Sequence, residues 1–226
     1  MSDPTQDLQL QTDYIVVEGP IGVGKTTLAR RLADSLGCSC LLEPAADNPF
    51  LDRFYTEGRR HALSTQLYFL LQRHQQMSVL EHQDLFQPQL VADFLLQKDR
   101  LFAEVTLDAQ ELALYNQIQQ SLDTRGPVPD LVIYLQAPAQ VLLERIRRRG
   151  VPAERHLDAE YLNALIEAYT RFFYFYDEAP LLIVNASEID LANNDDHYRA
   201  LLSSIERMQH SGSGMRQYFN PHPTLI

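Results

Sequence analysis

The sequence predicts a single α/β domain built on a parallel sheet, and three observations support this class. Short apolar runs alternate with longer stretches of helical periodicity between residues 14 and 210. The run at residues 131–135 is unbroken, which is typical of a strand covered on both faces. The chain has 226 residues, 45% of them hydrophobic, which suits one domain with a sizeable core. Strands separated by helices imply parallel pairing with right-handed crossovers.

The elements follow in order along the chain. We expect five strands, at residues 14–17, 38–42, 90–92, 131–135 and 181–184. We expect helices from the end of the first turn to residue 36 and at residues 50–55, 61–82, 99–104, 108–122, 138–149, 158–177 and 195–210. Residues 1–12 should form a disordered arm and residues 13–210 the folded domain. A Gly/Ser break then leads to a tail at 211–226 that is either flexible or docked.

Composition limits the functional classes. The formal net charge of −11 argues against nucleic acid as the main partner, since a duplex binder needs a basic surface. No apolar run approaches the ~18 residues of a membrane span, and the first residues do not resemble a secretion signal. The only cysteines, Cys38 and Cys40, are poorly placed for a disulfide bond, so we expect reduced thiols and a cytoplasmic location.

Residues 14–27, YIVVEGPIGVGKTT, combine a strand, a glycine-rich turn and the start of a helix. The turn matches G-x-x-x-x-G-K-[ST] with Gly19, Gly24, Lys25 and Thr26 in register. Backbone N–H groups of such a loop converge on a polyphosphate, the lysine adds a positive charge and the threonine offers an oxygen to Mg²⁺. The residues predicted to bind the nucleotide are Gly19, Pro20, Ile21, Gly22, Val23, Gly24, Lys25, Thr26 and Thr27.

Two carboxylates follow neighbouring strands. Glu43 precedes Pro44, which ends the second strand, and Asp93 directly follows the third. Glu18 lies inside the end of the first strand and is expected either to be structural or to support residues of the site from behind. Ligands of open α/β sheets bind at the carboxyl ends of the strands. Phosphoryl transfer needs a Mg²⁺ anchor and a group that accepts the proton of the attacking hydroxyl. We assign Asp93, with Thr26, to the metal and Glu43 to the proton; exposed loop carboxylates are the alternative.

An arginine cluster lies in an otherwise acidic chain. The segment Glu-Arg-Ile-Arg-Arg-Arg-Gly places Arg145 and Arg149 on one helix face, with Arg155 close behind. This pattern predicts a mobile arginine lid over a nucleotide, and a solvated face is the alternative. On the long helix, Gln66 and Arg73 are seven residues apart and share a face. A side-chain amide can pair with the edge of a nucleobase, although an exposed glutamine is the commoner case.

Over nearly its whole length the chain resembles the deoxyribonucleoside kinase family. The shared motifs are the loop from Gly19 to Thr26, Glu43-Pro44, Tyr55, the segment STQLYFLLQR that contains Gln66 and Arg73, Asp93 with Asp99, and Arg145-Ile-x-x-Arg149-Gly with Glu154. The resemblance implies a P-loop NTPase-type three-layer fold with a five-stranded parallel sheet, an arginine-rich lid and a homodimer. It also implies ATP as the phosphate donor with Mg²⁺, and a deoxynucleoside as the acceptor.

The resemblance further implies a role for each matching residue. Glu43 would be the base at the 5′-hydroxyl, and Lys25, Arg145 and Arg149 the cations that act on the phosphates. Gln66 would read the nucleobase. Tyr55 and Glu154 would bind the sugar 3′-hydroxyl, and Arg73 with Asp99 would shape the base pocket beside Phe69 and Phe94.

Two positions depart from the family pattern. Phe94 stands where many members have an arginine, which makes Lys98 the candidate for help at the 5′-hydroxyl, and Val151 replaces a further lid arginine. The pattern Asp-Phe-x-x-x-Lys resembles the bacterial branch of the family, which favours purine deoxynucleosides. A kinase acting on thymidylate and a non-catalytic nucleotide-binding subunit are the competing interpretations. The residues beside Glu43-Pro44, Leu42 and Ala45, do not match the thymidylate kinase pattern.

Overall fold

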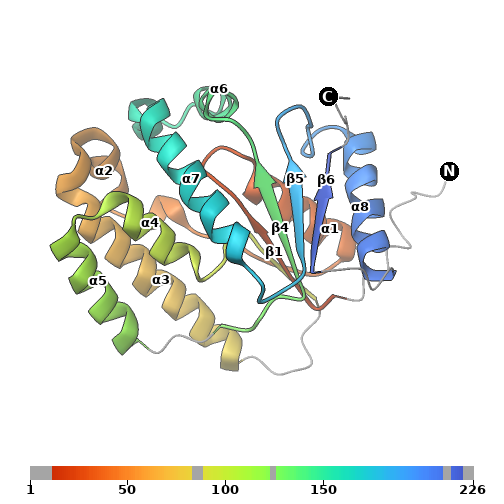
Figure 1. The fold of residues 1–226 in the computed structure, drawn as a ribbon, viewed down its shortest axis with the longest axis horizontal. Coiled ribbons are helices and arrows are strands. Elements are labelled where there is room, and N and C mark those ends of the chain that lie inside the picture. The colour runs from red at the N-terminus through yellow and green to blue at the C-terminus, as the bar shows by residue number, and fades with distance from the viewer. Residues whose placement is uncertain (1–11, 83–88, 123–125, 211–214, 221–226) are drawn as a thin grey trace.

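One six-stranded parallel sheet organises the computed structural model, which describes residues 12–82, 89–122, 126–210 and 215–220. Its strands lie in the order β2-β3-β1-β4-β5-β6. Figure 1 shows β1, β4, β5 and β6 side by side in the middle of the molecule. The strands are β1 (Tyr14–Glu18), β2 (Ser39–Leu41), β3 (Leu90–Ala92), β4 (Leu131–Gln136), β5 (Leu181–Asn185) and β6 (Arg216–Phe219). The predicted parallel α/β class is confirmed.

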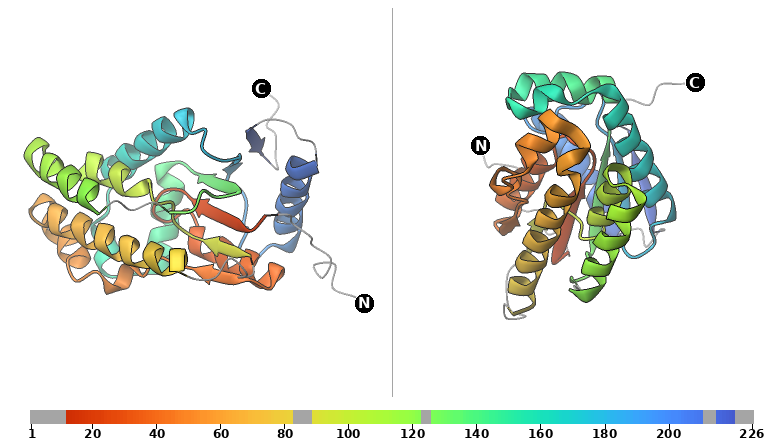
Figure 2. Two further views of the ribbon diagram at one scale, coloured as in Figure 1. Left: turned by 90° about the horizontal axis from the view of Figure 1, so that it is seen from below. Right: turned by 90° about the vertical axis from the view of Figure 1, so that its left-hand side faces the viewer.

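The helices cover both faces of this sheet (Figure 2). They are α1 (Lys25–Leu36), α2 (Leu51–Glu57), α3 (Ala62–His82), α4 (Lys98–Thr106), α5 (Ala109–Ser121), α6 (Ala139–Arg149), α7 (Ala159–Phe175) and α8 (Asp195–His210). Three short 3₁₀ turns occur at η1 (Ala45–Asp47), η2 (Gly58–His61) and η3 (Ala153–His156). All eight predicted helices are present, with boundaries shifted by a few residues.

Successive side chains of β1 point to opposite faces of the sheet, so the core has two layers. Ile15 and Val17 pack with α1, α6 and α8, whereas Tyr14 and Val16 pack with α4 and α7 on the opposite face. A third cluster joins α2, α3, α4 and α5 and contains the buried Tyr115. Because β1 lies between β3 and β4, its carboxyl end meets the elements that follow both neighbours.

The prediction of five strands is wrong, because part of the C-terminal tail adds a sixth. β6 pairs parallel to β5, and its Phe219 is 8% exposed and joins the core. The Arg216 side chain donates hydrogen bonds to the carbonyl groups of Phe173, Tyr174 and Tyr176 at 2.6, 3.1 and 3.1 Å, which satisfies acceptors left at the end of α7. The sequence Arg-Gln-Tyr-Phe has no unbroken apolar run, so periodicity did not reveal this strand.

Most of the predicted arm and parts of the predicted tail lie outside the described residues, namely residues 1–11, 211–214 and 221–226. The expected disorder of the arm therefore stays a prediction. Thr12 is described and is 5% exposed, so the buried part of the domain begins one residue earlier than expected. Both cysteines are free thiols. Among the described helices, we find none with the length and apolar character that a bilayer crossing requires.

Candidate active site

The phosphate loop joins β1 to α1, and its backbone has a positive φ, which favours glycine, at Gly19, Gly22 and Gly24. Gly19 and Gly22 have φ of 149° and 82°. A Cβ on Gly19 would lie 2.5 Å from the Leu135 carbonyl oxygen, and one on Gly22 would lie 2.7 Å from the Ile146 side chain. Gly24 is the left-handed residue before α1, so the helix begins at Lys25 with its N–H groups directed at the loop. This geometry suits an anion.

Lys25 extends back over the loop. Its Nζ donates hydrogen bonds to the carbonyl oxygens of Gly19 at 2.7 Å and Pro20 at 3.2 Å. Burial and the neighbouring Lys98 ammonium lower its pKa to about 8, against the opposing influence of the nearby carboxylates. A bound polyphosphate would stabilise the charged form of Lys25, because it would add negative charge beside the ammonium group.

Asp93 joins the phosphate loop to the segment after β2. Its Oδ2 accepts a hydrogen bond from Thr26 Oγ1 at 2.5 Å, and its Oδ1 accepts one from the Glu43 N–H at 2.8 Å. Asp93 is 3% exposed. A hydroxyl and a carboxylate in contact beside a phosphate-binding loop are the oxygen donors that Mg²⁺ takes from proteins, with phosphate and water completing its shell. The donor set therefore fits the predicted metal.

Glu43 follows β2 and is held by two cations. Arg73 pairs with its Oε1, and Lys98 Nζ donates to Oε2 at 2.9 Å. Burial alone would raise the pKa of Glu43, but the charges of Arg73, Lys98 and Lys25 outweigh it and lower the pKa to about 2. Glu43 is therefore a carboxylate at any physiological pH. Lys98, named from the sequence as the candidate for help at the 5′-hydroxyl, thus contacts the proposed base, and its role at that hydroxyl stays a prediction.

Arg73 also pairs with Asp99, and the two are 3% and 1% exposed. The guanidinium lies over the rings of Phe69 and Phe94, at 5.2 and 5.9 Å from their centroids. Phe69 and Arg73 line the same cavity, which is described below. Asp99 lines a different cavity, and Phe94 is 0% exposed. Phe94 does not line the cavity of Phe69 and Arg73, and its place as a wall of the substrate pocket stays a prediction. Asp99 acts on the pocket through Arg73.

Two cavities meet at the phosphate loop. The first, about 910 Å³, lies between α1, α6 and the β5–α8 loop, and the second, about 150 Å³, lies between α2, α3, α4 and α7. Gly22, Lys25, Thr26 and Arg149 line both. We call the larger one the donor cavity and the smaller one the acceptor cavity. A group bound in one can reach a group bound in the other only at the residues that line both.

The predicted nucleotide-binding residues divide between these cavities. Gly22, Val23, Gly24, Lys25, Thr26 and Thr27 line the donor cavity. Ile21 lines the acceptor cavity instead. Gly19 and Pro20, at the start of the loop, line neither cavity, and their carbonyl groups accept hydrogen bonds from Lys25 Nζ.

The acceptor cavity gathers the predicted substrate residues from distant parts of the chain. Tyr55, Gln66, Arg73, Lys98 and Glu154 all line it, together with Glu43. Gln66 is 3% exposed, so its amide is enclosed rather than solvated. Burial, with the nearby Tyr161, Glu154 and Glu43, raises the pKa of Tyr55 well above its ordinary value, so its hydroxyl stays a hydrogen-bond donor.

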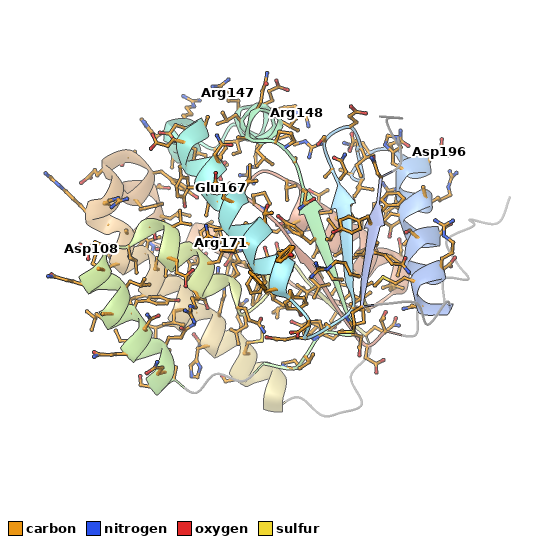
Figure 3. All side chains as sticks on the ribbon, in the orientation of Figure 1. Asp108, Arg147, Arg148, Glu167, Arg171 and Asp196 are labelled. Carbon is orange, nitrogen blue, oxygen red and sulfur yellow. The ribbon has the colours of Figure 1, made fainter. Side chains whose placement is uncertain are left out.

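The lid arginines have different surroundings. Arg149 makes a two-pronged pair with Glu154, with Nη2 at 2.7 Å from Oε1, and stands where the cavities meet. Arg145 donates to the carbonyl groups of Val23 at 3.2 Å and Ala186 at 2.6 Å, so it braces the walls of the donor cavity. Both arginines line the donor cavity, and the mobile arginine lid over a nucleotide stays a prediction. Figure 3 shows Arg147 and Arg148 on α6, and both are exposed.

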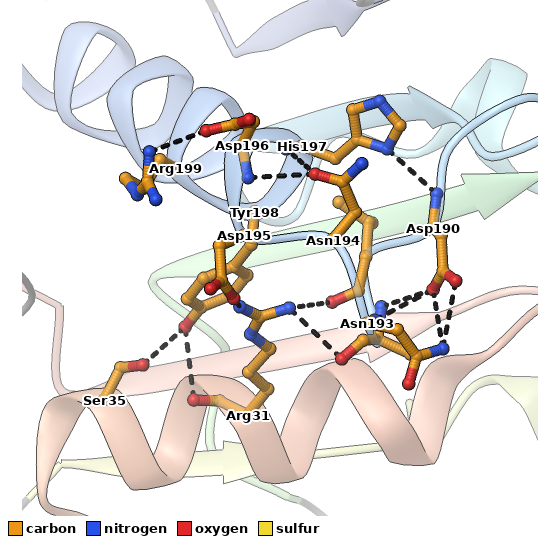
Figure 4. A network of polar contacts seen from close by, with 12 residues as sticks. Arg31, Ser35, Asp190, Asn193, Asn194, Asp195, Asp196, His197, Tyr198 and Arg199 are labelled. Carbon is orange, nitrogen blue, oxygen red and sulfur yellow. Dashed lines mark hydrogen bonds and ion pairs between the residues drawn. The ribbon is translucent and has the colours of Figure 1, made fainter.

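The β5–α8 loop was missed by sequence reasoning, although residues 186–193 line the donor cavity. Figure 4 shows how it is held. Asp190 Oδ1 accepts from the N–H groups of Ala192 and Asn193 at 3.0 and 2.9 Å, and Arg31 of α1 donates to the Leu191 carbonyl at 2.9 Å. An Asp with an Asn three residues later indicates a turn, but not that this turn adjoins a nucleotide.

A parallel α/β fold with a phosphate loop between a donor and an acceptor cavity defines a phosphotransferase of the phosphate-loop class. A model of the deoxynucleoside kinase family matches residues 15–210. The deoxyguanosine kinase of Bacillus subtilis (strain 168) is 32% identical over 200 residues, covering 86% of this chain and 97% of that relative. The deoxyadenosine/deoxycytidine kinase of the same organism is 28% identical over 209 residues, covering 88% and 94%.

Solved structures share the fold. The deoxyadenosine kinase from M. mycoides with bound dATP has a TM-score of 0.74 and 23% identity, covering 85% of this chain and 99% of that chain. The chain belongs to the deoxynucleoside kinase family. It is therefore a kinase that handles nucleosides and nucleotides, which removes the non-catalytic and thymidylate kinase alternatives.

Proposed function

We propose that this kinase transfers the terminal phosphoryl group of ATP to the 5′-hydroxyl of a purine deoxynucleoside. The observation that carries the proposal is the junction of the two cavities. Lys25, Thr26 and Arg149 line both, and Glu43 lies on the acceptor side with Lys98 and Arg73 on its carboxylate. A phosphoryl group held by the loop therefore meets a hydroxyl held by Glu43.

The chemistry follows from these positions. The 5′-oxygen forms a bond to the γ-phosphorus, the bond from that phosphorus to the bridging oxygen breaks, and ADP leaves with the electron pair. The hydroxyl proton passes to Glu43. A carboxylate with a pKa of about 2 is a weak base, so the proton should move late, after bond breaking is well advanced. Lys25 and Arg149 would stabilise the charge on the transferred group.

Thr26 and Asp93 are the residues that would hold Mg²⁺. The bound ion would neutralise negative charge on the phosphates. The Thr26–Asp93 hydrogen bond keeps these two oxygens together, and the bond from the Glu43 N–H fixes the Asp93 carboxylate relative to the base.

The purine preference rests on Gln66 and on the relatives. The enclosed Gln66 amide can satisfy a purine ring nitrogen and an exocyclic group together. One relative is named for deoxyguanosine and another for deoxyadenosine, while a third is named for both deoxyadenosine and deoxycytidine. An assay should therefore determine which base is preferred.

We also propose that two copies of the chain associate. α3 and α5 pack against each other, and each carries an exposed leucine, Leu71 at 51% and Leu114 at 45%. Sedimentation at micromolar concentration should give twice the monomer mass. Leu71→Glu combined with Leu114→Glu should give the monomer.

The direct test is product formation with ATP and Mg²⁺ against deoxyadenosine, deoxyguanosine, deoxycytidine, thymidine and the matching monophosphates. We expect 5′-monophosphates from nucleosides, with the highest kcat/KM for a purine. Phosphorylation of monophosphates alone would overturn the assignment, and a preference for a pyrimidine would overturn only the choice of base.

A further inference from the structure

Glu18 is a buried carboxylate that the proposed chemistry does not use. It ends β1 and is 1% exposed. Three donors converge on it: the Gly19 N–H at 2.8 Å and the Tyr169 hydroxyl at 2.9 Å on Oε1, and the Leu95 N–H at 2.8 Å on Oε2. These donors belong to the phosphate loop, to α7 and to the turn between β3 and α4. One side chain thus joins the phosphate loop to the β3–α4 turn, and the Tyr169 hydroxyl is a third donor to it.

The two backbone bonds of Glu18 lead to opposite sides of the reaction. Gly19, whose N–H is on Oε1, accepts a hydrogen bond through its carbonyl from Lys25 Nζ at 2.7 Å. Leu95, whose N–H is on Oε2, accepts through its carbonyl from the Lys98 N–H at 3.1 Å. Lys98 Nζ then donates to Glu43 at 2.9 Å. A path of five hydrogen bonds, linked through the covalent bonds of Gly19, Glu18, Leu95 and Lys98, therefore connects Lys25 to Glu43.

Only a carboxylate satisfies this arrangement. Its two oxygens are acceptors in both directions, whereas the isosteric amide has one acceptor and one donor. An amide at this position would set its NH₂ group against either the Gly19 N–H or the Leu95 N–H, so one of the two backbone bonds would be lost. Aspartate would keep both acceptors but is one methylene shorter, so it could not reach both N–H groups from the same backbone.

We infer that Glu18 is a positioning residue that fixes the phosphate loop relative to the β3–α4 turn, and thereby sets Lys25 and Glu43 at the separation that in-line transfer needs. This inference rests on the proposed function, since it assigns Glu18 a role in that same reaction. Glu18 lies behind both cavities and need not touch either substrate. Its effect should therefore appear in the chemical step rather than in binding.

The test compares Glu18→Gln and Glu18→Asp with the intact protein in steady-state kinetics and in equilibrium binding of ATP and of the best nucleoside. We expect kcat to fall by about 10-fold or more in both variants, because small misplacements of reacting groups carry large rate losses. The dissociation constants should change by less than about twofold. Values of kcat within twofold of the intact protein, or a loss confined to binding, would overturn the inference.

Tyr169→Phe is the matched control. It removes the third hydrogen bond to Glu18 and keeps the ring that stacks against Tyr134 and Phe173. It should lower the melting temperature much as Glu18→Gln does, while kcat stays within twofold of the intact protein. An equal loss of kcat in Tyr169→Phe would show that reduced stability, and not the link between loop and turn, explains the effect of Glu18.

Failure of this inference is distinguishable from failure of the proposed function. If the intact protein phosphorylates no deoxynucleoside, the proposed function is wrong. If the intact protein is active and both Glu18 variants match it, only the positioning role is wrong. Should Glu18→Gln not fold, Glu18→Asp decides the question by the same criterion, since it keeps the negative charge that the three donors require.

Discussion

The donor and acceptor cavities adjoin one phosphate loop but are built in different ways. The donor cavity is about 910 Å³ and is lined by the phosphate loop, by residues 186–193 and by side chains of α6 that include Arg145, Arg148 and Arg149. The acceptor cavity is about 150 Å³ and is lined by polar, charged and aromatic side chains from several elements. The N–H groups of the loop suit a polyphosphate that every donor nucleotide shares, whereas enclosed side chains suit discrimination among acceptors.

The two cavities also differ in the arrangement of their charged groups. In the acceptor cavity, Glu43 pairs with both Arg73 and Lys98, and Arg73 also pairs with Asp99, which lies outside this cavity. Each of the four has an exposed side-chain fraction of 13% or less. Lys25, which lines both cavities at the phosphate loop, is a half-buried cation with a lowered pKa, and a bound polyphosphate would be its anionic partner. Changes on the donor side should therefore abolish transfer for every acceptor, and changes on the acceptor side should alter rate and choice.

The largest effect is expected for Lys25→Ala. The loop would lose the charge that follows the transferred phosphoryl group, so kcat should fall by about 10³-fold for every nucleoside, on the scale of losing a transition-state donor. Single-turnover product formation measures this. Arg30→Ala, on the exposed face of the same helix, should leave kcat unchanged. A near-normal rate in Lys25→Ala would contradict the assignment of this loop as the catalytic one.

Glu43→Gln should have the next largest effect. The amide keeps the shape of the carboxylate but accepts no proton, so kcat should fall by about 10²-fold while the fold and nucleoside binding remain. Kinetics combined with calorimetric binding would measure both quantities. Glu57→Gln, at an exposed ion pair with His61, is the control. Normal turnover in Glu43→Gln would transfer the role of base to Asp93.

Gln66→Ala should separate recognition from chemistry. We expect kcat/KM for the best purine deoxynucleoside to fall by ~10-fold, about 1.4 kcal/mol, the scale of one well-made hydrogen bond. The exposed Gln75 on the same helix provides the control variant Gln75→Ala. An equal loss for all four deoxynucleosides would mean that Gln66 supports the pocket without reading the base.

The smallest effect is a pH dependence on the donor side. As pH rises through the lowered Lys25 pKa of about 8, the free enzyme loses the ammonium, so kcat/KM for ATP should fall about fourfold between pH 7 and pH 8.5. Bound phosphates favour the charged form, so the fall in kcat should occur at higher pH. Glu43, with a pKa of about 2, should add no acid limb above pH 4. A flat kcat/KM profile to pH 9.5, with the protein still folded, would contradict the lowered lysine pKa.

The sequence by itself determined the parts that depend on local geometry. The phosphate loop is contiguous, and its glycine spacing, lysine and threonine specify both the backbone and the ligand. Glu43 and Asp93 could be placed at the sheet edge because each follows a strand, and parallel strands end at the same edge. The alternation of apolar runs and helical periods gave the correct fold class for the same reason, since burial imposes those periods.

Tertiary structure alone decided the parts that depend on contacts between distant segments. The sequence does not show that Phe94 is fully buried beside Arg73, or that Arg145 donates to backbone carbonyl groups. The sixth strand needed β5 as a template, because its own four residues carry no periodic signal. Glu18 is a single charged residue at the end of an apolar run. Its links to the phosphate loop and to the β3–α4 turn are visible only in the folded chain, where the Gly19 and Leu95 N–H groups and the Tyr169 hydroxyl donate to it. A hydrogen bond between residues 151 positions apart leaves no local pattern, because its geometry exists only after the chain has folded.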